Sequence, residues 1–143
     1  MGSHSTNAET LAARVYARAH LSGEFRLRSG AISGEYFDKY LFEGDPQLLR
    51  EVGEALVTLL PERVDAAGLV LGGVPLATIV SQVSGLPTLF VREQAKTYGT
   101  CRLAEGGDVA GRRIAVVEDV VSSGGALIEG CSALRELGAD VVR

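Results

Sequence analysis

Residues 113–125 read RIAVVEDVVSSGG, and their pattern indicates the fold class. Its apolar first half is typical of a buried strand and passes directly into the acidic pair Glu118-Asp119. Small residues follow, and helical spacing of apolar positions then predicts a helix from Ser123 to Leu137, with Gly138 as its C-terminal stop. The stretch therefore predicts a strand, a tight turn and a helix in succession.

The same order of strand, turn and helix precedes this stretch. The apolar run Ala67–Leu71 is followed by Gly72-Gly73 and by a helix expected from Pro75 to Ser84, and Thr88–Val91 is the next apolar run. Another strand begins at Val141-Val142. Apolar strands that alternate with amphipathic helices indicate a parallel sheet covered on both faces. The predicted fold class is α/β, with a mainly parallel sheet flanked by helices and ligands bound at the carboxyl ends of the strands.

The N-terminal part is expected to form a small extension of this sheet domain. Apolar spacing indicates a helix over residues 7–21, and the alternation around Phe25 and Leu27 indicates a strand. An extended segment is expected over 32–40, and a helix begins at Asp45-Pro46, with Asp as its N-cap. Residues 1–8 have the character of an added tag with a disordered start, so we expect residues 9–143 to form a single domain.

The composition excludes several classes of protein. The chain has 143 residues, 46% of them hydrophobic, and a net charge of −4, so no nucleic-acid partner is expected. No apolar run approaches the ~20 residues that span a bilayer, so no membrane partner is expected either. Cys101 and Cys131 lack metal-ligand spacing, and the chain has only 2 histidines. We expect reduced thiols and a cytoplasmic location.

The acidic pair and the turn after it suit a phosphorylated sugar. Adjacent carboxylates at Glu118-Asp119 accept hydrogen bonds from the two hydroxyls of a ribose. Small residues from Ser122 to Gly125 let the backbone approach a ligand, and amides at a helix N-terminus bind phosphate. The alternative is that Ser123 is only an N-cap and that the acidic pair is a solvated strand end.

The segment between Arg92 and Arg113 is a long loop with an excess of positive charge. It contains five basic residues against three acidic ones, in a chain that is acidic overall. Loops of about 20 residues inside compact domains are uncommon and often act as lids. The alternative is an ordinary solvated loop.

The complete segment from Val116 to Gly125 resembles the phosphoribosyl-diphosphate signature of type I phosphoribosyltransferases. Further motifs, in the same order as in orotate phosphoribosyltransferases, extend the resemblance from about residue 11 to residue 143. They are an N-terminal region (25–30 and 36–40), a diphosphate-binding turn (71–77), a mobile catalytic loop (90–99) and the far end of that loop (103–106). This family continues past Arg143 with further sheet, so we expect the C-terminal part of the domain to be missing.

The resemblance implies transfer of ribose 5-phosphate from 5-phosphoribosyl 1-diphosphate to a nucleobase, orotate above all, in pyrimidine nucleotide biosynthesis. It implies Mg²⁺ bound mainly through diphosphate and water, with no direct protein ligand, and a homodimer. The expected catalytic residues are Arg92, Lys96 and Asp119. The expected substrate-binding residues are Arg28, Tyr36, Phe37, Gly72, Gly73, Tyr98, Glu118, Asp119, Val121, Ser122, Ser123, Gly124, Gly125 and Ala126. For Arg28, Tyr36 and Phe37 the alternative is a surface arginine beside core aromatics.

The catalytic loop departs from the family pattern Arg-Lys-x-x-Lys-x-His-Gly at two positions. Glu93 stands where the family has a lysine, and Tyr98 stands where it has a histidine. Tyrosine, with a pKa of ~10, is a poor proton shuttle near neutral pH. These departures keep open an alternative function, a non-catalytic regulatory homologue that binds phosphoribosyl diphosphate or a nucleotide.

Overall fold

The computed structural model describes the backbone of residues 4–143 and the side chains from Thr10 onward. The chain forms two compact units, the first ending at Val52 and the second running from Gly53 to Arg143. Residues 1–3 of the expected tag lie outside the described residues, and the first helix begins at His4.

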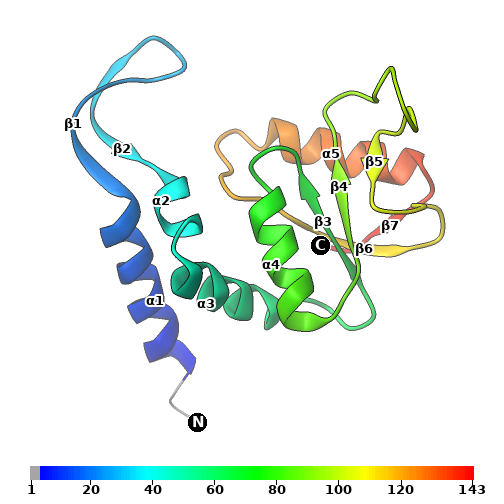
Figure 1. Cartoon of the computed structure of the whole chain (residues 1–143), viewed down its shortest axis with the longest axis horizontal. Helices are drawn as coiled ribbons and strands as arrows, with labels where there is room; N and C mark the ends of the chain where they lie inside the picture. Colours follow the sequence, from blue (N-terminus) through cyan, green and yellow to red (C-terminus); the bar gives the residue numbers. More distant parts are fainter. Residues whose placement is uncertain (1–3) are drawn as a thin grey trace. The chain divides into compact units, whose positions relative to one another are not determined.

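The second unit contains a five-stranded sheet in the order β5-β4-β3-β6-β7 (Figure 1). Four strands run parallel: β3 (Asp65–Leu69), β4 (Thr88–Val91), β6 (Arg113–Val117) and β7 (Asp140–Val141). The edge strand β5 (Ala104–Glu105) pairs with β4 in the antiparallel sense. The prediction of a mainly parallel sheet flanked by helices is confirmed.

Helices α4 (Val74–Ser84) and α5 (Gly125–Glu136) cover opposite faces of this sheet. A Cβ at Gly68 would lie 2.7 Å from the Cβ of Ala77 in α4. A Cβ at Gly130 in α5 would lie 2.5 Å from Cδ2 of Leu69. Because neighbouring residues of a strand point to opposite faces, β3 contacts α4 through Gly68 and α5 through Leu69.

The apolar core of the second unit lies between the sheet and α5. Leu134 of α5 is fully buried there, and Leu127 packs against the same cluster. The sheet and the loops beside it contribute the other buried members, Ala67, Leu69, Leu89, Val91, Ala104, Val109 and Ile114. Leu69 and Val91 are register partners in adjacent parallel strands, so their side chains line the same face.

The first unit consists of helices and one hairpin. Helix α1 (His4–Ala19) leads into strands β1 (His20–Arg26) and β2 (Ile32–Phe37), which pair antiparallel. The short helix α2 (Lys39–Glu43) follows, and α3 (Pro46–Val57) begins in this unit and ends in the second. None of the helices in the described part of the chain has the length and apolar character needed to cross a bilayer.

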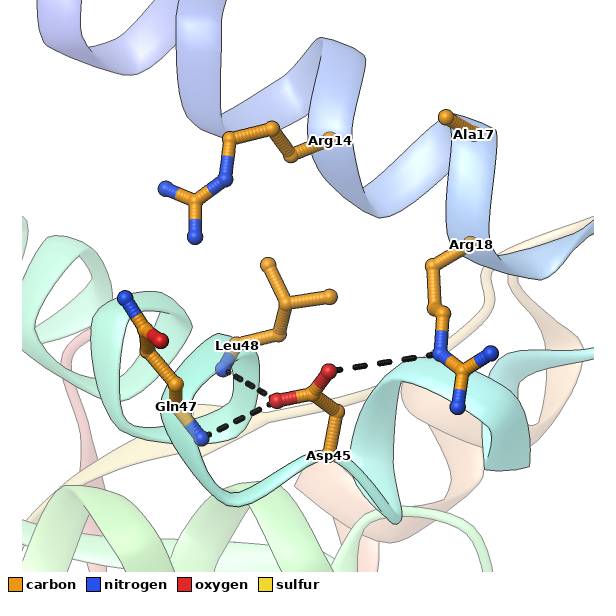
Figure 2. Close-up of a pocket in the computed structure, with 6 residues that line it drawn as sticks. All are labelled: Arg14, Ala17, Arg18, Asp45, Gln47 and Leu48. Carbon is orange, nitrogen blue, oxygen red and sulfur yellow. Dashed lines mark hydrogen bonds and ion pairs between the residues drawn. The ribbon is translucent and has the colours of Figure 1, made fainter.

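The start of α3 confirms the predicted N-cap. Asp45 Oδ1 accepts hydrogen bonds from the amides of Gln47 at 3.1 Å and Leu48 at 3.2 Å (Figure 2). These residues, with three from α1, line a cavity of about 360 Å³. Its arginines are already paired, Arg14 with Glu51 at 2.7 Å and Arg18 with Asp45 at 4.0 Å. We therefore interpret the cavity as part of the packing between α1 and α3.

The ends of β3 and α1 differ from the expected ones. Strand β3 ends at Leu69, and Leu71, which was expected in the strand, is 73% exposed in the turn that follows. Helix α1 ends at Ala19, because residues from His20 onward pair with β2. The sequence did not predict α2 or β5, since segments of 5 and 2 residues are too short to show a period.

We predict that Leu134→Ala destabilises the chain by about 2–5 kcal/mol, because it removes a fully buried side chain from the core and leaves a cavity. Ile128→Ala is the matched control in the same helix, where the side chain is 66% exposed. Its effect on the free energy of unfolding should stay within about 0.5 kcal/mol. Urea denaturation followed by circular dichroism measures both, and equal losses would contradict this account of the core.

Candidate functional site

Three turns with candidate site residues lie at one edge of the sheet. They follow β4, β3 and β6, which are parallel neighbours. Leu69 pairs with Val91, and Gly68 pairs with Val117, so the three strands end at nearly the same level. The structure therefore brings Gly72-Gly73, the start of the 92–103 loop and the segment from Glu118 to Gly125 to the same carboxyl edge.

The turn after β3 is held by close backbone contacts at Gly73. A Cβ at this position would lie 2.7 Å from Leu69 N and 3.0 Å from Val117 O, so a side chain cannot fit. Gly73 is the N-cap of α4 and makes no side-chain cap hydrogen bond. Its own amide donates to Leu69 O at 2.8 Å, and the Val74 amide donates to Leu71 O at 3.2 Å. Because these two amides already have partners, an anion at this turn would be bound by neighbouring amides, such as that of Gly72. The dipole of α4 would attract it as well.

The acidic pair lies directly beyond the end of β6. Glu118 and Asp119 are both half-buried. Glu118 Oε1 accepts a hydrogen bond from the amide of Asp119 at 3.0 Å, which fixes the first carboxylate against its own backbone. The Oδ2 atom of Asp119 is buried. Two carboxylates in this partly shielded position do not form the fully solvated strand end of the alternative interpretation.

The turn from Ser122 to Gly124 leads into an uncapped helix. Gly124 has a φ of 85°, in the left-handed region that glycine adopts without strain, and it is the N-cap of α5 without a side-chain cap hydrogen bond. Ser123 is therefore not the N-cap, although its Oγ accepts from the Gly125 amide at 3.3 Å. A small cavity of about 90 Å³ lies here, lined by residues 118 and 120–127, which include Val121, Ser122 and Ala126. The amides of the first helical turn and two exposed serine hydroxyls surround it.

Two cations of the 92–103 loop, Arg92 and Lys96, are paired with the same carboxylate. Lys96 Nζ lies 2.9 Å from Glu105 Oε1, and Arg92 Nε lies 3.6 Å from the same oxygen. The hydrogen bond from Lys96 and the charges of both cations lower the pKa of the Glu105 carboxyl. Tyr98 is 69% exposed, and its ring centroid lies 5.5 Å from Lys96 Nζ.

The expected base-side residues all belong to the first unit. Arg28 is exposed in the turn between β1 and β2. Tyr36 stacks on Phe25 at 5.6 Å, and Phe37 lies 6.4 Å from the ring of Phe42. Both are more than 40% exposed, so neither is a core aromatic. As consecutive strand residues they point to opposite faces of the hairpin, and the structure does not bring these two rings together.

Sequence reasoning missed Glu105 as a member of the site. The signal was present, since Glu105 stands at the far end of the basic loop. Its pairing with Lys96 depends on the antiparallel return of the chain along β4, which a two-residue strand does not reveal in the sequence.

Comparison with known proteins adds independent evidence on the family. Residues 66–143 match the family model described as phosphoribosyl transferase domain. An orotate phosphoribosyltransferase of Nocardioides sp. strain JS614 is 57% identical over 133 residues, covering 92% of this chain and 74% of that protein. One from Halobacterium salinarum is 42% identical, covering 85% of this chain and 69% of that protein.

Solved structures agree with this result. An orotate phosphoribosyltransferase of Mycobacterium tuberculosis in complex with Fe(III) dicitrate has a TM-score of 0.81 and 30% identity, covering 93% of this chain and 78% of that one. A phosphoribosyltransferase of Corynebacterium diphtheriae has a TM-score of 0.79 and 34% identity, covering 96% of this chain and 79% of that one. The shared fold, the glycine turns at the carboxyl edge and these identities show that the chain belongs to the phosphoribosyltransferase family, among the orotate phosphoribosyltransferases.

Proposed function

We propose that this chain transfers ribose 5-phosphate from 5-phosphoribosyl 1-diphosphate to orotate, giving orotidine monophosphate and diphosphate in pyrimidine nucleotide biosynthesis. The observation that carries the proposal is the acidic pair at the end of β6 beside two helices, α4 and α5, that begin without side-chain caps. Relatives that are orotate phosphoribosyltransferases, at 57% and 42% identity, support the reaction and the base.

We name the segment from Glu118 to Gly125, together with Gly72 and the first turn of α4, the cradle. The cradle binds the sugar phosphate along the whole length of the ligand. The carboxylates of Glu118 and Asp119 accept hydrogen bonds from the two ribose hydroxyls. The amides of the first turn of α5, with the hydroxyls of Ser122 and Ser123, donate to the 5-phosphate. The Gly72 amide and the N-terminal end of α4 face the diphosphate. Backbone donors of this kind attract an anion although the chain carries a net charge of −4.

The chemical step breaks the bond between the anomeric carbon and the diphosphate oxygen. The electron pair of that bond leaves with the diphosphate, and a ring nitrogen of orotate forms the new bond to the anomeric carbon while its N–H proton passes to the diphosphate or to water. Negative charge grows on the leaving group while the sugar becomes oxocarbenium-like, so cations near the diphosphate stabilise the transition state. Lys96 and Arg92 supply that positive charge, and Tyr98 binds the substrate beside them. Asp119 holds the ribose in place.

We propose that the substrate carries Mg²⁺ to the described residues, bound mainly through diphosphate and water. None of their histidine, cysteine, aspartate and glutamate side chains form a cluster of three or more that could hold a metal ion. The acidic pair offers carboxylates without a cage, and Mg²⁺ is commonly held by one or two carboxylates plus substrate phosphates and water. When bound, Mg²⁺ neutralises part of the diphosphate charge.

We propose that the base is recognised by Arg28, Tyr36 and Phe37. Their exposure in the hairpin of the first unit supports a contact role rather than a packing role. Arg28 is suited to the carboxylate of orotate, because a guanidinium binds a carboxylate with two parallel hydrogen bonds.

The proposal extends to assembly and location. We propose that residues 9–143 act as one phosphoribosyltransferase-like domain in a cytoplasmic homodimer. The unpaired thiols of Cys101 and Cys131 support a reducing compartment. Light scattering tests this proposal, because a homodimer has twice the 15.0 kDa mass of one chain.

A regulatory homologue that binds phosphoribosyl diphosphate without turnover is the second candidate. Tyr98 and Glu93 favour it, because they replace a histidine and a lysine of the family loop. Incubation of the chain with phosphoribosyl diphosphate, orotate and Mg²⁺, followed by assay of released diphosphate, separates the two functions. Binding without release favours the regulator, and release favours the enzyme.

We predict that Asp119→Asn weakens binding of phosphoribosyl diphosphate roughly 10- to 100-fold, since it removes a charge-assisted hydrogen bond worth about 1.5–3 kcal/mol. Asp140→Asn is the matched control, because Asp140 lies at the amino end of the parallel strands, 68% exposed and 3.8 Å from Arg113. Calorimetry should give a dissociation constant near the wild-type value for this control. An unchanged constant for Asp119→Asn would exclude the carboxylate from ribose binding.

We predict that Lys96→Gln lowers kcat roughly 100- to 1,000-fold with a smaller change in KM, because the lysine acts mainly on charge that develops in the transition state. Arg102→Gln changes another cation of the same loop, one that pairs with Asp108 at 3.2 Å, and should retain a kcat close to that of the wild type. Steady-state kinetics measure both variants. Equal losses of kcat would show that overall loop charge, not Lys96, matters.

A further inference from the structure

One carboxylate oxygen holds both proposed catalytic cations. Glu105 Oε1 lies 2.9 Å from Lys96 Nζ and 3.6 Å from Arg92 Nε, and it accepts a hydrogen bond from Thr100 Oγ1 at 3.5 Å. We name these four residues the Glu105 cluster. The Lys96 side chain is only 17% exposed within it, although lysines in loops usually extend into solvent. The cluster therefore fixes the lysine at the strand edge.

Glu105 lies in the edge strand, on the far side of β4 from the turns after β3 and β6 that carry the proposed cradle residues. Glu105 is the register partner of Phe90, Phe90 of Gly68, and Gly68 of Val117. Two of these steps place the backbone of Glu105 about 10 Å from β3, whose following turn faces the diphosphate in the proposed function, and the third places it about 15 Å from the residue that precedes the acidic pair. Figure 1 likewise draws the 92–103 loop apart from the turn that follows β6. A diphosphate that binds Lys96 therefore replaces the Glu105 carboxylate as the partner of this lysine.

Other contacts stabilise the same arrangement of the loop. The amide of Arg92 donates to Leu103 O at 2.8 Å, and the amide of Lys96 donates to Arg102 O at 3.3 Å, so the loop folds back along itself. The Tyr98 ring lies 5.5 Å from Lys96 Nζ, within the range of a cation–π interaction. The loop thus has a defined ligand-free state.

We propose that Glu105 is a positioning residue that sets this resting state, and that its carboxylate competes with the diphosphate of the substrate for Lys96 and Arg92. The inference rests on the proposed function, since it takes the substrate to be a diphosphate. Both anions bind the same two cations, and diphosphate carries the larger charge. Binding of the substrate therefore exchanges one partner for another, and the loop closes only when the anion is present.

The exchange has a measurable consequence for affinity. An interaction made only in the resting state lowers the apparent affinity of any ligand that needs the closed state. The ion pairs of Glu105 are partly exposed, and solvent screening keeps the contribution of such pairs small. Removing the Glu105 charge should therefore tighten binding of phosphoribosyl diphosphate roughly 1.5- to 5-fold. The population of the open loop in the ligand-free chain should rise by a similar factor.

The test compares the wild-type chain with Glu105→Gln and with Asp108→Asn. The control removes a carboxylate that pairs with Arg102 at 3.2 Å and leaves the Glu105 cluster intact. Limited trypsin digestion of the ligand-free proteins, followed by mass spectrometry, measures cleavage after Lys96. We expect roughly 1.5- to 5-fold faster cleavage in Glu105→Gln, because cleavage follows the population of the open form, and the wild-type rate in Asp108→Asn.

Cleavage after Arg135 in α5 reports on the fold in the same digests. If Glu105→Gln also raises the rate of cleavage after Arg135, the substitution has disturbed the fold. Glu105→Asp is then tested in place of Glu105→Gln, because it keeps the charge and shortens the side chain by one methylene group. Unchanged cleavage after Lys96, or equal acceleration in the control, would overturn the proposal.

Calorimetry with phosphoribosyl diphosphate and Mg²⁺ provides the second readout. Tighter binding by Glu105→Gln supports the competition, and unchanged or weaker binding overturns it. A wild-type chain that does not bind phosphoribosyl diphosphate overturns the proposed function instead. The digestion of the ligand-free protein would then still decide whether Glu105 holds the loop.

Discussion

The close approach of backbone at Gly68 and Gly73 is the constraint on which the site depends. A Cβ at Gly68 would lie 2.5 Å from Gly73 O, and a Cβ at Gly73 would lie 2.8 Å from Leu69 O. Any side chain at either position would push α4 away from the central strand β3. Without side chains there, the first turn of α4 packs on β3 and reaches the carbonyl of Val117, so the N-terminus of α4 and the end of β6 meet.

This meeting point explains how an acidic chain presents a site for an anion. The chain carries a net charge of −4, and the residues nearest the cradle include the acidic pair Glu118-Asp119. In the proposed site, the attraction for phosphate comes from backbone amides and helix dipoles rather than from side-chain charge. Because Gly73 and Gly124 are the N-caps of α4 and α5, no side chain of the cap residue competes for those amides.

The 92–103 loop has a defined structure in the ligand-free chain. Tyr98, which stands where the family has histidine, contacts the ammonium of Lys96, so the replacement has a partner in the resting state. Nothing in the structure explains Glu93, whose side chain is exposed. The positive charge of the loop is therefore held at the edge strand, where Glu105 neutralises part of it.

The amino-acid sequence alone predicted the fold class, the strand-turn-helix units around residues 67–84 and 113–137 and the residues that are proposed for the cradle. These features are local, since apolar runs, glycine turns and helical spacing are properties of neighbouring residues. The strand order and the pairing of Lys96 with Glu105 are visible only in the folded structure. Those features depend on which distant segments pair and in which register, and a strand as short as β5 carries no periodic signal of its partner.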